Sequence, residues 1–184
     1  MSNKIQHRGC IVEIERDEYA ETPDSWGDDS LFLVAGHRDF WVPGPDKEEP
    51  ERAKERYKTH YVFGLEAYIH GGVVLALAGE GNFPDRQWDV SRLGYVFVSK
   101  ADYGDKDRAR EIALSLIREW NMYLSGDVWN VSITGPTGDD IETFGGVYGD
   151  YDETVAEAKR TIDRVTGQGT REPNGQYLFP FAAS

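Results

Sequence analysis

Apolar and polar residues alternate over several short segments, which is the pattern of half-buried β-strands. These segments are residues 10–15, 31–42, 62–78, 93–99, 128–134 and 141–148. Residues 93–99 carry apolar side chains on both faces, which predicts a central strand. Gly71 and Gly72 interrupt the third segment, so it forms one strand or two. The turn sequence GPTGDD joins the last two segments and predicts an antiparallel hairpin.

A repeat of three to four residues predicts an amphipathic helix over residues 108–124. Asp105 or Asp107 can cap its first turn, and Gly126 ends it. The apolar stripe of this helix predicts that it packs on the sheet. Its members are Ile112, Ala113, Leu116, Ile117, Trp120, Tyr123 and Leu124.

Two further helices are expected. One is short and exposed, beginning at Pro50 and ending near His60. The other is capped by Asp152 and runs to about Val165. It directs Val155, Ala158 and Ile162 inward.

Pairs of strands followed by a helix predict an α+β fold, with one mainly antiparallel sheet and helices packed on one face. The chain has 184 residues, which fits one domain over residues 1–165 and a C-terminal tail over 166–184. The tail is rich in glycine and then aromatic. Its apolar group, Tyr177, Leu178, Phe179 and Phe181, either docks on the body or engages a partner, which leaves an oligomerisation module as one alternative.

Composition points to a reducing compartment. Cys10 is the single cysteine, so the chain cannot form an internal disulfide or a cysteine-based zinc site. The first ten residues lack the apolar region of a secretory signal, and the apolar run over residues 73–78 is too short to span a membrane. We therefore expect a cytoplasmic protein without a membrane partner. Oligomeric state is left open.

The net charge of the chain is the strongest indication of which class of partner it binds. The chain has 20 basic and 33 acidic residues, a net charge of −13 and a pI near 4.7. Direct binding to nucleic acid is not expected, because that binding depends on basic patches. A basic surface on another protein is the expected partner, and partial mimicry of DNA is one form of this. Mimicry requires the acids to gather in space, because one net charge per roughly 700 Å² of surface is far more dilute than duplex DNA.

Two segments of the chain resemble a known family of proteins. Residues 88–100, WDVSRLGYVFVSK, resemble a signature of uncharacterised proteins encoded by phages and mobile elements. Residues 123–129, YLSGDVW, are similar to a helix-to-strand turn of the same family. The matching features further include His70 with Gly71, the loop with Pro23 and Trp26, and the strand ending in His37 and Arg38. The resemblance covers most of the chain, and it implies a gene that acts on host defence systems without implying a chemistry.

The enzyme alternative depends on one histidine. His70 stands between Ile69 and a pair of glycines, and Asp89 or Asp127 could orient it as a general base. The competing interpretation is a histidine in a turn, with Asp89 bonded to loop amides. The four histidines have no metal-ligand spacing, and the chain contains no GxxxxGK[ST] loop and no GxSxG elbow. No metal or cofactor is expected.

Acidic loops supply the candidate binding residues. The competing interpretation is that they are ordinary solvated loops. Tryptophans near them fit interface anchors, although they could equally be core residues. We expect a protein that binds and inhibits a host nucleic-acid-handling protein through these positions. They are Asp24, Asp28 and Asp29; Asp139, Asp140 and Glu142; Asp150, Asp152 and Glu153; and the side chains of Trp26 and Trp129.

Overall fold

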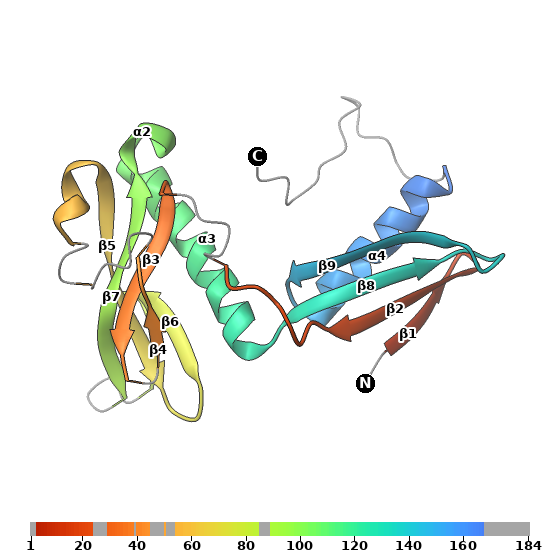
Figure 1. The fold of residues 1–184 in the computed structure, drawn as a ribbon, viewed down its shortest axis with the longest axis horizontal. Coiled ribbons are helices and arrows are strands. Elements are labelled where there is room, and N and C mark those ends of the chain that lie inside the picture. The colour runs from red at the N-terminus through yellow and green to blue at the C-terminus, as the bar shows by residue number, and fades with distance from the viewer. Residues whose placement is uncertain are drawn as a thin grey trace. The chain divides into compact units, whose positions relative to one another are not determined.

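The computed structural model of the chain describes residues 3–23, 29–38, 40–44, 50, 54–84 and 89–167. The chain divides into two compact units. The terminal unit is formed by residues 1–17 and 129–184, and the inserted unit by residues 18–128. Each unit has its own antiparallel sheet and its own helix across that sheet (Figure 1).

The terminal unit contains a four-stranded sheet in the order β1-β2-β8-β9. Its elements are β1 (Asn3–His7), β2 (Cys10–Arg16), β8 (Val128–Thr134), β9 (Asp140–Tyr148) and α4 (Tyr151–Val165). Inward residues alternate along β2, where Cys10, Val12 and Ile14 are all buried. They pack with Ala158 and Ile162 of α4, so the helix covers one face of the sheet.

The inserted unit contains a five-stranded sheet in the order β4-β3-β7-β5-β6. The longest helix, α3, begins after the Asp105 cap and ends at Gly126, whose φ of 74° is left-handed. The elements are β3 (Leu31–His37), β4 (Phe40–Val42), η1 (Lys54–Lys58), β5 (His60–Ile69), β6 (Val73–Leu77), β7 (Val90–Ser99), α2 (Lys100–Tyr103) and α3 (Lys106–Ser125).

The two faces of the inserted sheet are covered differently. On one face, residues of alternate parity such as Leu33 and Val96 pack against α3, including Trp120. The other face carries a smaller cluster of Phe32, Val34 and Phe97. The edge strand β6 is held by α3 through the side-chain amide of Asn121, which accepts from the Leu75 N–H at 2.8 Å and donates to its carbonyl at 3.0 Å.

The α+β class with antiparallel sheets is confirmed, and α3 and α4 each pack on one face of a sheet. The strands form two sheets where the sequence analysis expects one. The division into compact units describes contacts, so the expectation of one domain over residues 1–165 stays a prediction. The 166–184 tail lies outside the described residues beyond Gly167, and so do its aromatic side chains.

Individual elements also differ from expectation. The segment 31–42 is not one strand but the β3–β4 hairpin, in which Gly36 pairs with Trp41. The cap of α4 is Asp150 and not Asp152, because Asp150 has extended backbone angles and accepts from the Glu153 N–H. The strand β1 and the single-turn helix α2 are additional elements.

Candidate functional site

The first group of expected binding residues lies at the start of α4. Asp150 accepts a hydrogen bond from the Glu153 N–H at 2.8 Å, so its carboxylate caps the first turn of α4. Asp152 and Glu153 are exposed in the first turn. No cationic partner of either carboxylate is found among the described residues. The positive end of the helix dipole nevertheless favours acids here, which gives them a local role as well.

The second group lies at the turn between β8 and β9. The Thr137 hydroxyl donates to the Asp139 carboxylate, and this bond holds the pKa of Asp139 below its ordinary value. Asp140 is exposed at the start of β9. Glu142 lies 3.4 Å from an Arg164 guanidinium nitrogen, so it is partly neutralised.

Basic side chains are concentrated near this turn. The β1–β2 turn places His7 and Arg8 against Asp163 of α4, with His7 Nε2 at 2.9 Å from the carboxylate. Bonds from both side chains lower the pKa of Asp163. Together with Arg164, they make this end of the terminal unit a mixed charge network, and not an acidic patch.

The two acidic groups are therefore far apart within the terminal unit. They lie at opposite ends of β9, and nine strand residues span about 30 Å. Two further acids, Glu15 and Asp17, lie at the α4 end, because Arg16 at the end of β2 pairs with Trp129. The register of β2 against β8 brings them there, and the sequence alone carries no signal for that register.

The tryptophan of this region is a core residue. Trp129 is 8% exposed, and its indole N–H donates to the Gly149 carbonyl at 2.8 Å. Arg16 lies over its ring, 5.4 Å from the centroid. Trp129 therefore belongs to the core cluster of the terminal unit.

The remaining acidic loop is described in part. Asp24, Trp26 and Asp28 lie outside the described residues. Asp29 is exposed in the inserted unit, and its backbone carbonyl accepts from His60 Nε2 at 2.8 Å. His60 is buried with its ring edge-to-face against the stacked rings of Phe32 and Phe97, so this bond ties the loop to the sheet.

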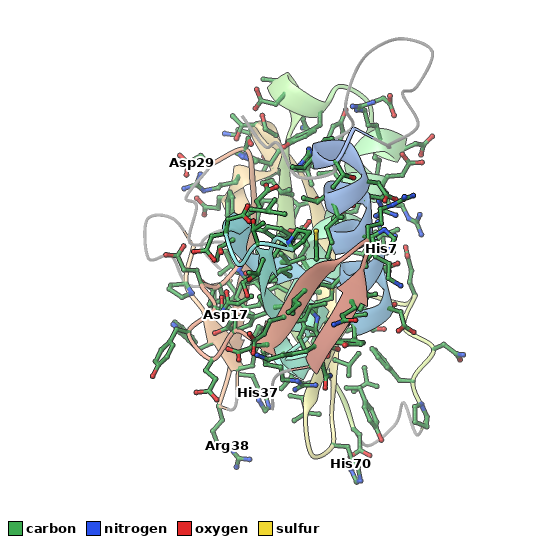
Figure 2. The ribbon with its side chains drawn as sticks, turned by 90° about the vertical axis from the view of Figure 1, so that its right-hand side faces the viewer. His7, Asp17, Asp29, His37, Arg38 and His70 are labelled. Carbon is green, nitrogen blue, oxygen red and sulfur yellow. The ribbon has the colours of Figure 1, made fainter. Side chains whose placement is uncertain are left out.

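The structure brings His70 and Asp89 together. Nδ1 of His70 lies 3.6 Å from an Asp89 carboxylate oxygen, which is longer than a hydrogen bond. The His70 side chain is 72% exposed and projects outward from the β5–β6 turn (Figure 2). Asp127 lies beyond the end of α3 and accepts from the Ser125 hydroxyl at 2.7 Å. The pair therefore has the residue types of a general base, in a site open to water.

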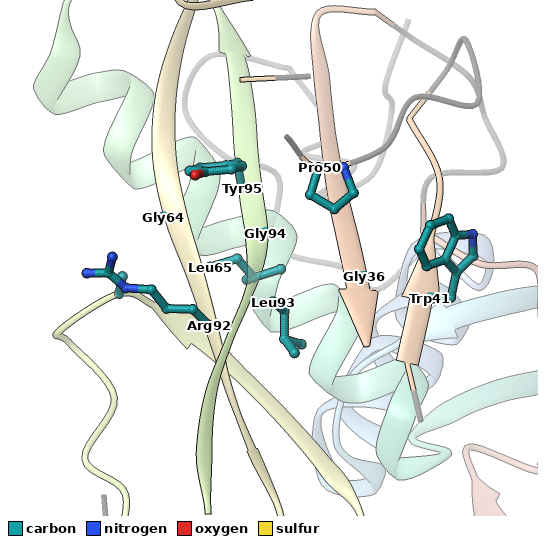
Figure 3. Close-up of a pocket in the computed structure, with 10 residues that line it drawn as sticks. Gly36, Trp41, Pro50, Gly64, Leu65, Arg92, Leu93, Gly94 and Tyr95 are labelled. Carbon is teal, nitrogen blue, oxygen red and sulfur yellow. The ribbon is translucent and has the colours of Figure 1, made fainter. Parts of the chain in front are cut away.

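A cavity that no sequence motif indicates lies in the inserted unit (Figure 3). Its volume is about 500 Å³, and residues of β3, β4, β5 and β7 line it. Glycines on adjacent strands, Gly36, Gly64 and Gly94, were the available sequence signal. Strand pairing was needed to bring them side by side.

Within the described ranges, no group of histidine, cysteine or acidic residues is arranged to hold a metal ion. No helix in the same part of the chain combines the length and apolar character needed to cross a bilayer. No family model, curated protein or solved structure matches the chain.

Proposed function

We propose that this chain is a non-catalytic binding protein that recognises a basic surface on another protein. The supporting observation is the pair Asp152 and Glu153, exposed at the start of α4 with no cationic partner among the described residues. Glu15 is exposed at the same end of the terminal unit. Carboxylates that no neighbour neutralises can steer a basic partner into contact.

The partner that we propose is a host nucleic-acid-handling protein in the cytoplasm, which the chain inhibits. Two considerations support this choice: the net charge of −13, and the resemblance to phage and mobile-element proteins. A basic nucleic-acid groove attracts acids for the same reason that it attracts phosphates. Since the two acidic groups of the terminal unit are about 30 Å apart along β9, the mimicry that we propose is local and partial.

The test compares two charge-matched variants. Asp152→Asn with Glu153→Gln removes the charges at the α4 end, and Gln at position 153 keeps the capping geometry. Asp139→Asn with Asp140→Asn removes the same number of charges at the β8–β9 turn. Tagged wild-type chain is used to capture host proteins, and each captured nucleic-acid-binding protein is purified for affinity and DNA-competition measurements.

We expect the α4 pair to weaken binding and DNA competition roughly tenfold at about 50 mM salt, and the turn pair to change them little. The difference between wild type and the α4 variant should shrink as salt is raised, because screening removes the attraction. If both variants bind and compete as well as wild type, the acidic-surface function is wrong.

An enzyme is the second candidate, favoured by the approach of His70 to Asp89. The control for the binding proposal is therefore a search for turnover of activated phosphodiesters and esters by wild type and His70→Ala. We expect no difference between them. Turnover that His70→Ala abolishes would replace the binding proposal with an enzymatic one.

A further inference from the structure

The cavity of the inserted unit lies on the sheet face that α3 leaves uncovered. Trp41 and Tyr95 stand on this face, since Tyr95 packs with the cluster of Phe32, Val34 and Phe97. Four neighbouring strands from β4 to β5 contribute to the lining, which spans about 14 Å across the sheet. The volume of about 500 Å³ is in the ordinary range for small-ligand sites.

Three glycines, Gly36, Gly64 and Gly94, are part of the lining. Gly36 is the cross-strand partner of Trp41, and Gly64 is the cross-strand partner of Tyr95. A Cβ at Gly36 would stand 3.2 Å from the Trp41 ring, which is a tight contact. A Cβ at Gly94 would collide with the Val34 carbonyl oxygen. Pro50 also stands over Gly36, so its ring lies between Trp41 and Tyr95 in the lining of the cavity (Figure 3).

Arg92 adds a positive charge to this apolar setting. Its side chain is exposed, and no hydrogen bond or ion pair of its guanidinium is found within the described part of the chain. The nearest acid by register, Glu66, is its cross-strand partner, but that carboxylate is buried and accepts from the Gly81 N–H at 3.4 Å. In a chain of net charge −13, a guanidinium that has no charged partner among the described residues and lines the same groove as two aromatic rings is a specific arrangement.

The chemistry of these groups defines the ligand. A guanidinium selects carboxylate or phosphate through paired N–H donors, and aromatic rings stack on planar heterocycles. Trp41 is 52% exposed, so its ring face is accessible to such a heterocycle. The net negative charge of the chain disfavours binding of a polyanion. Repulsion of a small anion with one or two charges is much weaker.

We propose that this groove of Trp41, Tyr95 and Arg92 binds a planar aromatic anion of the size of a nucleoside monophosphate. The heterocycle lies over Pro50 in contact with the two aromatic side chains, and the phosphate meets Arg92. This site is separate from the acidic residues of the proposed function. It can therefore fail or succeed independently of that function.

The test uses the full chain and titration calorimetry with the four nucleoside 5′-monophosphates, adenosine and inorganic phosphate as probes. We expect at least one monophosphate to bind with a dissociation constant below about 1 mM. Adenosine and phosphate alone should bind at least roughly tenfold more weakly than that monophosphate, because each satisfies only half of the site.

Substitutions in the groove test whether the monophosphate binds there. Arg92→Gln is expected to weaken the monophosphate roughly tenfold while leaving adenosine unchanged, and Trp41→Leu is expected to weaken both. The matched control is Arg118→Gln, an exposed arginine on α3, which should bind like wild type. Circular dichroism and the unfolding midpoint check that each variant is folded.

Two results would overturn the proposal. One is the absence of binding of every monophosphate at concentrations up to about 10 mM. The other is equal monophosphate affinity in wild type and in folded Arg92→Gln, which would place the anion elsewhere.

Discussion

The half-buried carboxyl of Glu119 on α3 destabilises the folded protein when it is ionised. It is half-buried, and burial raises its pKa above the ordinary value, with the neighbouring Arg118 charge opposing the shift. A raised pKa in the folded state means that ionisation of this carboxyl costs folding free energy. That cost is absent below the pKa of the unfolded chain, about 4.3, and is complete above the higher pKa of the folded protein.

We predict that Glu119→Gln raises the free energy of unfolding at pH 7 and has no such effect below about pH 4. Urea denaturation at a series of pH values measures this difference. The control is Glu111→Gln, an exposed position on the same helix. A stabilisation of Glu119→Gln that is the same at both ends of the pH range would contradict the titration argument.

Single residues also decide contacts that no periodicity predicts. The Asn121 amide pairs with both backbone groups of Leu75, as a neighbouring strand would. His60 ties the Asp29 backbone to the sheet. Both contacts join segments more than 30 positions apart in the chain, so neither residue stood out in the sequence.

At the scale of elements, the start of α4 depends on one side chain. Asp150 has extended φ and ψ of −71° and 162°, and its carboxylate accepts from the Glu153 N–H. Asp152 is already inside the helix, where it can interact only with the helix dipole. Two aspartates two positions apart gave the same sequence signal, and the backbone conformation separated their roles.

We predict that Asp150→Ala lowers the free energy of unfolding by about 1 kcal/mol, because one amide of the first turn loses its acceptor. Asp152→Ala is expected to cost only a few tenths of a kcal/mol. Chemical denaturation followed by far-ultraviolet circular dichroism compares the two variants. Equal losses would show that the dipole and not the cap sets the stability of this helix start.

At the scale of the whole molecule, the inserted unit interrupts the terminal unit between two neighbouring strands. β2 and β8 are antiparallel partners, and Arg16 stands opposite Trp129. The chain thus leaves the terminal sheet and returns to it at adjacent points, about 5 Å apart. The largest core, which includes Leu33, Val96 and Trp120, belongs to the inserted unit alone.

We predict that residues 18–128 fold when expressed without the rest of the chain, because that core is complete within them. Two-dimensional amide NMR spectra of this fragment and of the full chain should overlay at the core strands. A fragment without dispersed amide signals would instead support one cooperative domain over residues 1–165.

Local sequence patterns predict the strands and helices in which buried residues recur at a regular spacing. The alternation of Cys10, Val12 and Ile14 predicted the inward face of β2, and the apolar stripe of residues 108–124 predicted α3. The pattern over residues 31–42 predicts one strand, because neither Arg38 nor Asp39, which separate β3 from β4, is a glycine or a proline. The approach of His70 to Asp89 is one of two alternatives that the sequence leaves open, and no pattern in the sequence predicts the cavity near Gly36, Gly64 and Gly94.

The sequence by itself determined the α+β class, most helices and strands, and the excess of negative charge, because each follows from neighbouring residues or from composition. Tertiary structure alone decided that the strands divide between two sheets and that the acids of β9 and α4 lie at opposite ends of one strand. It also decided that Trp129 is buried and that Trp41, Tyr95 and Arg92 share one groove. The physical reason is that strand pairing joins residues distant in sequence, and its register is fixed by cooperative packing of whole faces and not by any local pattern.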